Sequence, residues 1–192
     1  MMPRLLIFTG FFYPHLGGYD LIINELASRL HSYAYDIDLV TCNTENASTY
    51  EIYNGIYIYR LPSWNILNKS YTIPKPTFQS IKIFYKILKS DYDLVQTNTR
   101  FFPISLIGLV VSKIIDKPLL HIEYGSQHSV LSNRILTLLS EIYDHFIGAI
   151  ILENAKGIIC NCQASERFLR HLCAKCKISC IPIYGINQSI FQ

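Results

Sequence analysis

The feature that most constrains the fold is a pair of glycines between a strand-like segment and a helix-like segment. Residues 5–8 form an apolar run that predicts a buried strand, and residues 22–30 place apolar side chains on one face of a helix. Between them, residues 11–18 have the sequence FFYPHLGG. Gly17 and Gly18 have no Cβ, so the turn is able to use positive φ and to lie close against a ligand. The N–H groups of the helix N-terminus suit a phosphate or a sugar hydroxyl, although a glycine loop that merely turns the chain is the alternative.

The rest of the chain alternates in the same way. Further strands are predicted at 36–41, 55–60, 93–97, 118–122, 157–160 and 177–181, and further helices at 77–89, 103–115, 131–154 and 164–172. Residues 43–50 predict a loop, and residues 61–76, with three prolines, predict an irregular segment. Strands separated by helices favour parallel pairing. We therefore expect the α/β class, with a single Rossmann-like, doubly wound, mainly parallel sheet of seven strands and helices on both faces.

Composition is that of one globular domain. The chain has 192 residues, of which 50% are hydrophobic and 16% are charged. No uninterrupted apolar run reaches the roughly 18 residues that a spanning helix needs. The apolar residues 5–12 are short and lack a small-residue cleavage site, so they predict a strand and not a signal peptide. We expect a cytoplasmic protein.

Basic residues gather in the segment 52–90, which contains six Lys and Arg residues and no acid, whereas the net charge is only +3. In the predicted helix 77–89, Lys82, Lys86 and Lys89 share one side. With Trp64 and Tyr71 nearby, that side is a candidate for contact with an anionic membrane surface. A surface helix with solvated lysines is the alternative. We expect no nucleic-acid partner.

The six cysteines are distributed unevenly. They are Cys42, Cys160, Cys162, Cys173, Cys176 and Cys180. The last five, with His171 nearby, invite comparison with a zinc site, but the paired C-x-x-C knuckles of such sites are absent. A disulfide formed under oxidation is a second alternative, and buried inert thiols are the favoured one. We predict no metal site.

Five stretches resemble, in the same order, the N-terminal domain of the family-four retaining glycosyltransferases of the GT-B fold. The first is the segment FYPHLGG with the helix that follows, which resembles F-Y-P-P-x-x-G-G and a helix ending E-L-A-x-x-L. Residues 93–98 (DLVQTN) resemble D-x-V-H-x-H, and residues 118–126 (PLLHIEYGS) resemble P-L-V-H-x-E-H-G-S. Residues 154–159 (NAKGII) resemble N-A-D-x-I-I, and residues 184–191 (YGINQSIF) resemble N-G-V-D-x-x-x-F.

The resemblance implies a division of labour between two domains. Residues 1–184 correspond to the N-terminal, acceptor-side domain, and residues 185–192 to the start of the interdomain linker. In the family, a second domain binds the nucleotide-sugar donor through a basic residue and an E-x7-E pair, and no two glutamates here have that spacing. We therefore expect that the donor domain is absent, that a donor is bound only with a C-terminal domain partner, and that the chain alone is inactive.

The resemblance also implies which residues line the interdomain cleft. Tyr124 stands where the family has histidine, and a tyrosine with an unperturbed pKa of about 10 donates hydrogen bonds but is a poor base. Arg100, which follows the strand 93–97, is a candidate for binding an acceptor phosphate, or alternatively for capping a loop. The other residues expected at the cleft are His15, Gly17, Gly18, Glu123, Gly125 and Ser126.

Two functions of different classes follow. The first is the acceptor-binding half of an enzyme that transfers a sugar from a nucleotide-sugar donor to a saccharide or lipid-linked acceptor. The second is a non-catalytic acceptor-binding or regulatory subunit at the membrane surface. A dinucleotide-binding protein is disfavoured, because the G-x-G-x-x-G fingerprint is missing.

Overall fold

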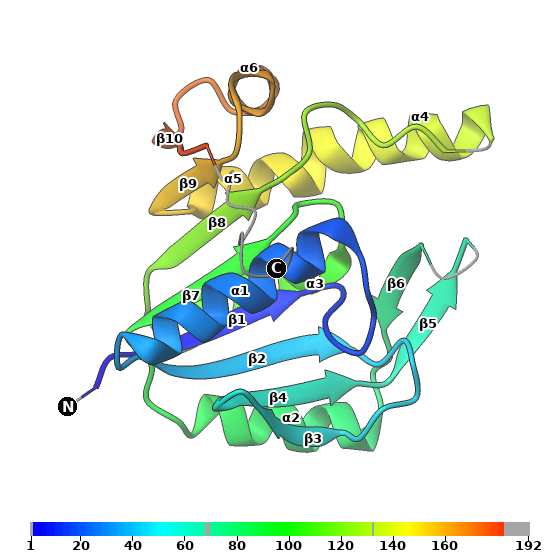
Figure 1. The fold of residues 1–192 in the computed structure, drawn as a ribbon. Coiled ribbons are helices and arrows are strands. Elements are labelled where there is room, and N and C mark those ends of the chain that lie inside the picture. Colours follow the sequence, from blue (N-terminus) through cyan, green and yellow to red (C-terminus); the bar gives the residue numbers. More distant parts are fainter. Residues whose placement is uncertain (1, 68–69, 132, 183–192) are drawn as a thin grey trace, which may run out of the picture.

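In the computed structural model, residues 2–67, 70–131 and 133–182 are described, and they form a mainly parallel sheet with helices on both faces (Figure 1). The predicted linker 185–192 lies outside these residues. Within them the main sheet has eight strands in the order β10-β9-β8-β7-β1-β2-β4-β3. These strands are β1 (Arg4–Thr9), β2 (Asp36–Cys42), β3 (Tyr50–Tyr53), β4 (Ile56–Leu61), β7 (Leu94–Asn98), β8 (Leu119–Glu123), β9 (Gly157–Cys160) and β10 (Ile178–Cys180).

The predicted parallel sheet is confirmed, but the expected number of strands is wrong by one. Every neighbouring pair is parallel except β3–β4, which is antiparallel. The additional strand β3 begins at the end of the segment predicted as a loop. Asn54 and Gly55 both have positive φ (50° and 78°), which is the backbone that a two-residue hairpin turn requires. The Asn-Gly pair was therefore an available hairpin signal that the pattern analysis missed.

A second hairpin occupies the segment predicted as irregular. It pairs β5 (Ser63–Ile66) with β6 (Tyr71–Pro74) in an antiparallel two-stranded ribbon. Pro74 lies at the end of β6, where a missing N–H is tolerated because no further strand pairs there. The ribbon projects beyond the carboxyl ends of the parallel strands (Figure 1).

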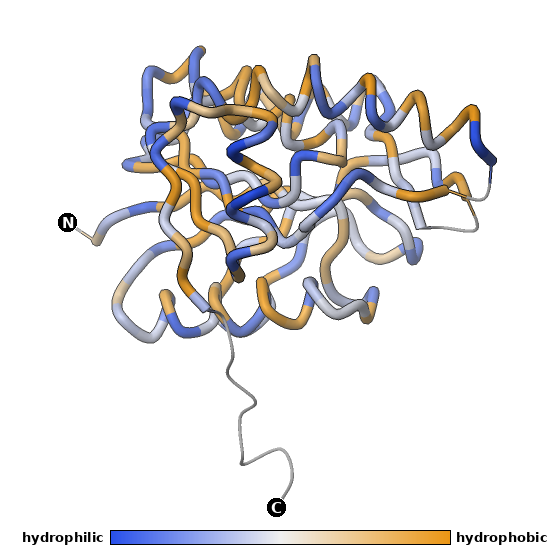
Figure 2. The backbone as a smooth tube through the Cα atoms, turned by 90° about the horizontal axis from the view of Figure 1, so that it is seen from above, coloured by the Kyte–Doolittle hydropathy of each residue, from blue (hydrophilic) through white to orange (hydrophobic). Residues whose placement is uncertain are grey.

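The helices divide the core into two layers. Alternate residues of β1 face opposite sides, so Leu5 and Ile7 pack with α1 while Leu6 and Phe8 pack with helices on the other face. Figure 2 shows the apolar strands enclosed between these layers. The helices are α1 (Gly18–Ser32), α2 (Phe78–Leu88), α3 (Pro103–Ile114), α4 (Arg134–Tyr143), the π-helix η1 (Asp144–Gly148), α5 (Ala149–Asn154) and α6 (Gln163–Leu172).

The segments α4, η1 and α5 form one continuous helix that corrects an expectation from the sequence. Residues 134–154 include an 18-residue stretch with a mean hydropathy of 1.6, so by length and composition alone this helix is long and apolar enough to cross a bilayer. In the structure the C-terminal part packs against the body, with Ile151 and Leu152 fully buried, whereas α4 projects outward (Figure 1). Asp144, one of the acids that interrupt the apolar run in the sequence, is fully buried.

The described cysteines include both a disulfide and buried free thiols, which are two of the three alternatives considered from the sequence. Cys173 and Cys176 form a disulfide at the end of α6. Cys42 and Cys160 are buried free thiols, and burial raises the pKa of Cys42 to about 12, so this thiol stays protonated and inert. Cys162 caps the N-terminus of α6 by accepting the Ser165 N–H.

Candidate functional site

The parallel topology brings most of the predicted residues to one edge of the sheet. Because β1, β7 and β8 are adjacent and parallel, the loops after them meet at their carboxyl ends. These loops carry Gly17 and Gly18, Arg100, and residues 124–126, respectively. The predicted position of the glycine pair at this edge is confirmed. Ser126 is exposed in the loop after β8.

The glycine pair begins α1, but not through the backbone conformation expected. Gly17 is the N-cap with φ −128° and ψ 166°, and neither Gly17 nor Gly18 has positive φ. The need for glycine at position 17 is steric, because a Cβ there would lie 2.8 Å from Asp20 Oδ2. At Gly18 a Cβ would meet nothing within 4 Å. The exposed first turn of α1 therefore has open space in front of it, as a ligand approaching its N–H groups would require.

His15 and Asp20 form a polar pair behind this turn. His15 Nδ1 lies 2.5 Å from Asp20 Oδ2, and the His15 ring stacks on Phe11 with centroids 4.4 Å apart. Asp20 is 2% exposed, and its second oxygen has no partner among the described residues. Burial raises the pKa of Asp20 although His15 acts against the shift. The sequence analysis missed Asp20. It could have been identified from its position, because an acid at the third position of a helix can reach back to the N-cap.

Aromatic rings pack together between the loops after β1 and β8. The Tyr19 ring lies 6.2 Å from Phe102 and 5.9 Å from Tyr124, measured between centroids. The Tyr124 hydroxyl is buried and has no partner within the described part of the chain. Burial, and secondly the charge of Glu123, raise the pKa of Tyr124 well above its ordinary value. The hydroxyl is therefore a neutral hydrogen-bond donor and not a base, in agreement with the sequence argument.

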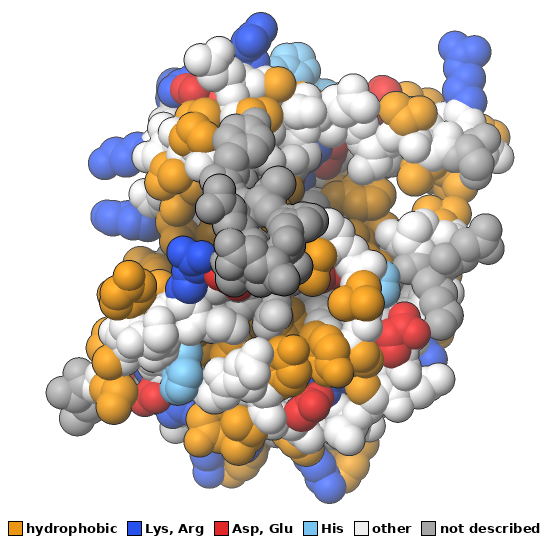
Figure 3. Space-filling model, in the orientation of Figure 1, with side chains coloured by type: hydrophobic (Ala, Val, Ile, Leu, Met, Phe, Trp, Pro, Cys, Tyr) orange, Lys and Arg blue, Asp and Glu red, His pale blue; other side chains and the backbone are white. Residues whose placement is uncertain are grey.

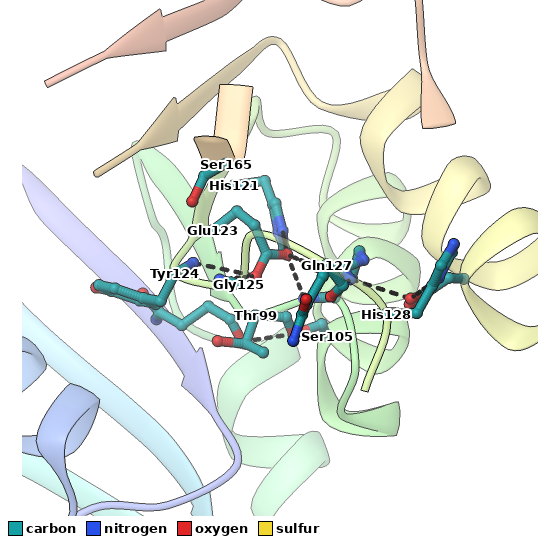
Figure 4. Close-up of polar contacts among 12 residues, drawn as sticks. Thr99, Ser105, His121, Glu123, Tyr124, Gly125, Gln127, His128 and Ser165 are labelled. Atoms are coloured by element: carbon teal, nitrogen blue, oxygen red, sulfur yellow. Dashed lines mark hydrogen bonds and ion pairs between the residues drawn. The ribbon is translucent and has the colours of Figure 1, made fainter. Parts of the chain in front are cut away.

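Glu123 is the fully buried centre of the polar network (Figure 4). One carboxylate oxygen accepts the N–H groups of Tyr124 and Gly125 at 3.0 and 2.8 Å. The other accepts from the Arg100 backbone and guanidinium at 3.1 and 2.9 Å, and lies 3.4 Å from His121 Nε2. Burial alone would raise the pKa of Glu123, but Arg100, His121 and the Gly125 N–H outweigh it and lower that pKa strongly. Glu123 is thus an ionised anchor for two loops.

Arg100 is enclosed by the protein. Its side chain is 3% exposed, and its Nη1 and Nη2 donate to Glu123 and Asp144 at 2.9 and 3.0 Å. Nη2 also donates to the Gln127 carbonyl at 3.1 Å, and the guanidinium lies 4.4 Å above the Phe168 ring. An arginine that is paired in this way is not presented to an acceptor phosphate. The structure favours the alternative of a loop-holding arginine.

The network continues to residues that the sequence analysis missed. Asp144, fully buried at the start of η1, also lies 2.8 Å from His128 Nδ1. His128 follows β8, and Figure 4 shows it at the end of the network beside the helical segment that contains η1. Asp144 could have been identified as a network residue because it is an acid inside the apolar stretch 131–154, and a buried charge needs a partner.

The basic residues of the segment 52–90 do not all lie on the surface. Arg60 is 2% exposed and pairs with Glu51 at 2.7 Å, so it contributes nothing to a basic surface. Lys82, Lys86 and Lys89 are exposed on α2, as predicted. Each lies over an aromatic ring; Lys82 is 4.7 Å from Phe78 and Lys89 is 4.3 Å from Tyr85. Figure 3 shows basic side chains beside apolar ones at the lower edge of the molecule, where Figure 1 places α2.

Comparisons with known proteins agree with this geometry. The profile of Glycosyltransferase Family 4 matches residues 16–183. An uncharacterized glycosyltransferase of Methanocaldococcus jannaschii is 32% identical over 173 residues, which are 86% of this chain and 43% of that protein. The chain thus spans less than half the length of this curated relative.

Solved structures share the fold. Sucrose-phosphate synthase from Thermosynechococcus elongatus superposes with a TM-score of 0.73 at 18% identity, over 98% of this chain and 49% of that chain. Anabaena HepE in complex with UDP and glucose superposes with a TM-score of 0.58 at 17% identity, over 93% of this chain and 44% of that chain.

Proposed function

Because the chain belongs to glycosyltransferase family 4, we propose that its α/β unit is the acceptor-binding half of an enzyme that transfers a sugar from a nucleotide-sugar donor. The acceptor is a saccharide or a lipid-linked saccharide, and the reaction takes place in the cytoplasm. The donor is bound by a second domain, on the same or a separate polypeptide. That HepE was crystallised with UDP and glucose supports a nucleotide-sugar as the donor class.

The observation that carries this proposal is the open space before Gly18, beside an aromatic wall. Sugar rings pack their apolar faces on aromatic side chains, and their hydroxyls accept hydrogen bonds from backbone N–H groups. Tyr19 and Tyr124 supply the aromatic surface, and the first turn of α1 supplies the N–H groups.

In this proposal Arg100 and Glu123 do not touch the acceptor. They hold the loops after β7 and β8 at a fixed distance, since Glu123 accepts from both loops at once. Gly125 is required there because a Cβ would lie 3.2 Å from Glu123 Oε1 and 3.3 Å from Arg100 Nη1. The network therefore fixes the position of Tyr124 relative to the loop after β7.

Saturation-transfer NMR with a panel of oligosaccharides tests the proposal. The variant Gly18→Ala adds one methyl group to the open space, so we expect saccharide affinity to fall by about fivefold or more without loss of thermal stability. The matched control is Gly157→Ala at the opposite edge of the sheet, where the nearest side-chain atom is an ordinary 3.7 Å from the added Cβ. Equal saccharide binding by both variants, or none by the wild type, contradicts the proposal.

A second candidate function, a non-catalytic subunit at the membrane surface, is favoured by the outer face of α2. Phe78, Ile81 and Tyr85 are 72%, 63% and 61% exposed beside the three lysines. Apolar and basic side chains on one helical face suit an anionic bilayer, and each lysine near such a surface contributes on the order of 1 kcal/mol. The same face would bring a catalytic half to a lipid-linked acceptor at the inner face of the membrane.

Co-sedimentation with liposomes tests this face. We expect weak binding to anionic vesicles at low salt. This binding should be lost when Lys82, Lys86 and Lys89 are replaced by Gln, because the substitutions remove the electrostatic attraction that salt screens. The control variant replaces Lys113, Lys156 and Lys175, which are exposed away from α2, and should sediment like the wild type. If the wild type fails to sediment, the lysines are a solvated face.

A further inference from the structure

Three histidines that are distant in the sequence meet on one surface of the fold. His128 comes from the loop after β8, His145 from η1 and His171 from the last turn of α6. One ring nitrogen from each lies within 4.8 Å of the others. The ring centroids of His145 are 5.2 Å from His128 and 5.4 Å from His171. Figure 3 shows histidine on the surface at the top of the molecule, beside α6.

The environment of His128 is that of a metal ligand. Its Nδ1 lies 2.8 Å from the buried carboxylate of Asp144. A hydrogen bond donated by Nδ1–H to that carboxylate fixes the tautomer, which leaves the lone pair of Nε2 available to a metal ion. Asp144 is itself held by Arg100 at 3.0 Å, so the orienting group is rigid.

The backbone around the cluster is also unusual. Asp144 and His145 are consecutive residues of the π-helix η1, one fully buried and the other exposed. Short π-helical segments inside α-helices occur frequently at functional sites. Here the segment directs Asp144 into the polar network while His145 lies next to His171 on the surface.

We propose that His128, His145 and His171 bind one zinc ion, with Asp144 as the residue that positions His128. Neutral imidazole suits zinc, and three histidines with a fourth position open to water form a known type of tetrahedral site. Zinc–nitrogen bonds of about 2.0–2.1 Å place ligand nitrogens roughly 3.4 Å apart, so the rings must close by about 1.4 Å at most. His145 and His171 are exposed and free to make that adjustment. The ion joins α6 to η1 and to the loop after β8, beside the pair Arg100–Asp144.

Zinc titration of the untagged full chain, by calorimetry and by thermal unfolding, tests this site. We expect one zinc ion per chain and a higher unfolding temperature with zinc than with EDTA. The double variant His145→Gln and His171→Gln should lose at least tenfold in zinc affinity and lose the zinc-dependent shift. Both side chains are exposed, so its unfolding temperature in EDTA should equal that of the wild type. Cobalt in place of zinc should show the absorption of a tetrahedral complex, which the double variant lacks.

Two controls separate this site from other ligands. His31→Gln alters an exposed histidine on α1 and should bind zinc like the wild type. Replacing the free thiols Cys162 and Cys180 by Ser should also leave binding unchanged, since the proposed ligands are imidazoles. The proposal is overturned if the wild type binds no zinc, if binding survives in the double variant, or if binding follows the thiols or His31.

Discussion

At the scale of single residues, the central fact is that Glu123, the last residue of β8, is a structural anchor. Glu123 is fully buried and accepts hydrogen bonds from two backbone N–H groups of its own loop and from Arg100. A buried carboxylate is stable only when such partners replace water. The same bonds that hold the loops leave no lone pair directed at a substrate. In the proposed function, contact with the acceptor at this edge therefore falls to the loop backbone and to Tyr124.

Glu123→Gln tests the anchor. The amide removes the charge opposite Arg100 and turns one acceptor into a donor that faces N–H groups, so we expect a loss of about 3–5 kcal/mol in the free energy of unfolding. Urea unfolding measures the loss. Glu25→Gln, which breaks an exposed pair with Arg29 on α1, should change stability by less than about 1 kcal/mol. A loss for Glu123→Gln as small as that of the control would show that the network adds no net stability.

The pH dependence of stability follows from the lowered pKa of Glu123. Below the ordinary carboxyl pKa of about 4.3 the unfolded state binds a proton that the folded state excludes, so the stabilising contribution is complete above this pH. It is lost progressively as the pH falls from there through the folded-state pKa. Asp20, whose pKa is raised, acts with the opposite sign, because its contribution is lost as the pH rises. We therefore expect the stability difference between wild type and Glu123→Gln to shrink below about pH 4, measured by urea unfolding across that range; a constant difference contradicts this.

At the scale of elements, close packing of α3 on the sheet sets the position of the loop that precedes it. Gly108 of α3 faces β1 and β7, and a Cβ there would overlap Thr97 Cγ2 and lie 3.0 Å from the Phe8 ring. The helix can therefore approach the sheet more closely than a side chain would permit. Its N-cap, Phe102, is part of the aromatic wall of the cleft.

Gly108→Ala should push α3 away from the sheet. Overpacking against side chains that are themselves buried costs about 1–3 kcal/mol, which exceeds the gain in helix propensity from alanine. Thermal unfolding measures the change, with Gly157→Ala as the control for a glycine whose added methyl fits. Should Gly108→Ala be as stable as the control, the tight approach of α3 is not a constraint on this fold.

The sequence predicted those elements whose pattern is local and strong. Apolar runs marked β1, β7 and β8, and helical periodicity marked α2 and α3 within one or two residues of the structure. The ribbon β5–β6 was missed because its strands are short and prolines interrupt the segment around them, so their pairing depends on the hairpin as a whole. The glycine turn was located correctly from its residues, but its conformation was not.

The site was predictable only where a motif spans adjacent residues. Glu123, Tyr124 and Gly125 were identified together from one stretch. The pairing of Arg100 with Asp144, and the meeting of the three histidines, depend on the order of the strands and on a π-helical segment. Neither of these is visible as a period or spacing in the chain.

At the scale of the whole molecule, two surfaces remain apolar on an otherwise well-packed unit. The helix α4 exposes Ile135, Leu138, Leu139 and Ile142, all more than 40% accessible, and the outer face of α2 exposes its aromatic side chains. Figure 1 places them toward opposite ends of the strand order. In the proposed function, the carboxyl edge of the sheet receives the acceptor, and these two apolar surfaces are separate from it.

The last prediction concerns activity. The chain spans 43% of its glycosyltransferase relative, and it contains no E-x7-E pair of the kind that the family resemblance associates with donor binding. Within the described residues, the groups at the carboxyl edge form a structural ion network. None of their side chains is placed to neutralise a departing diphosphate, since Arg100 is already paired with two carboxylates. We therefore expect the purified 192-residue chain to bind saccharides yet to transfer no radiolabelled sugar from a nucleotide-sugar above a protein-free blank. The control is the same assay with the chain joined to a donor-binding domain, where transfer should appear and should decrease in Gly18→Ala. Transfer by the chain alone would mean that this unit binds both substrates, and the division into an acceptor half and a donor half would have to be abandoned.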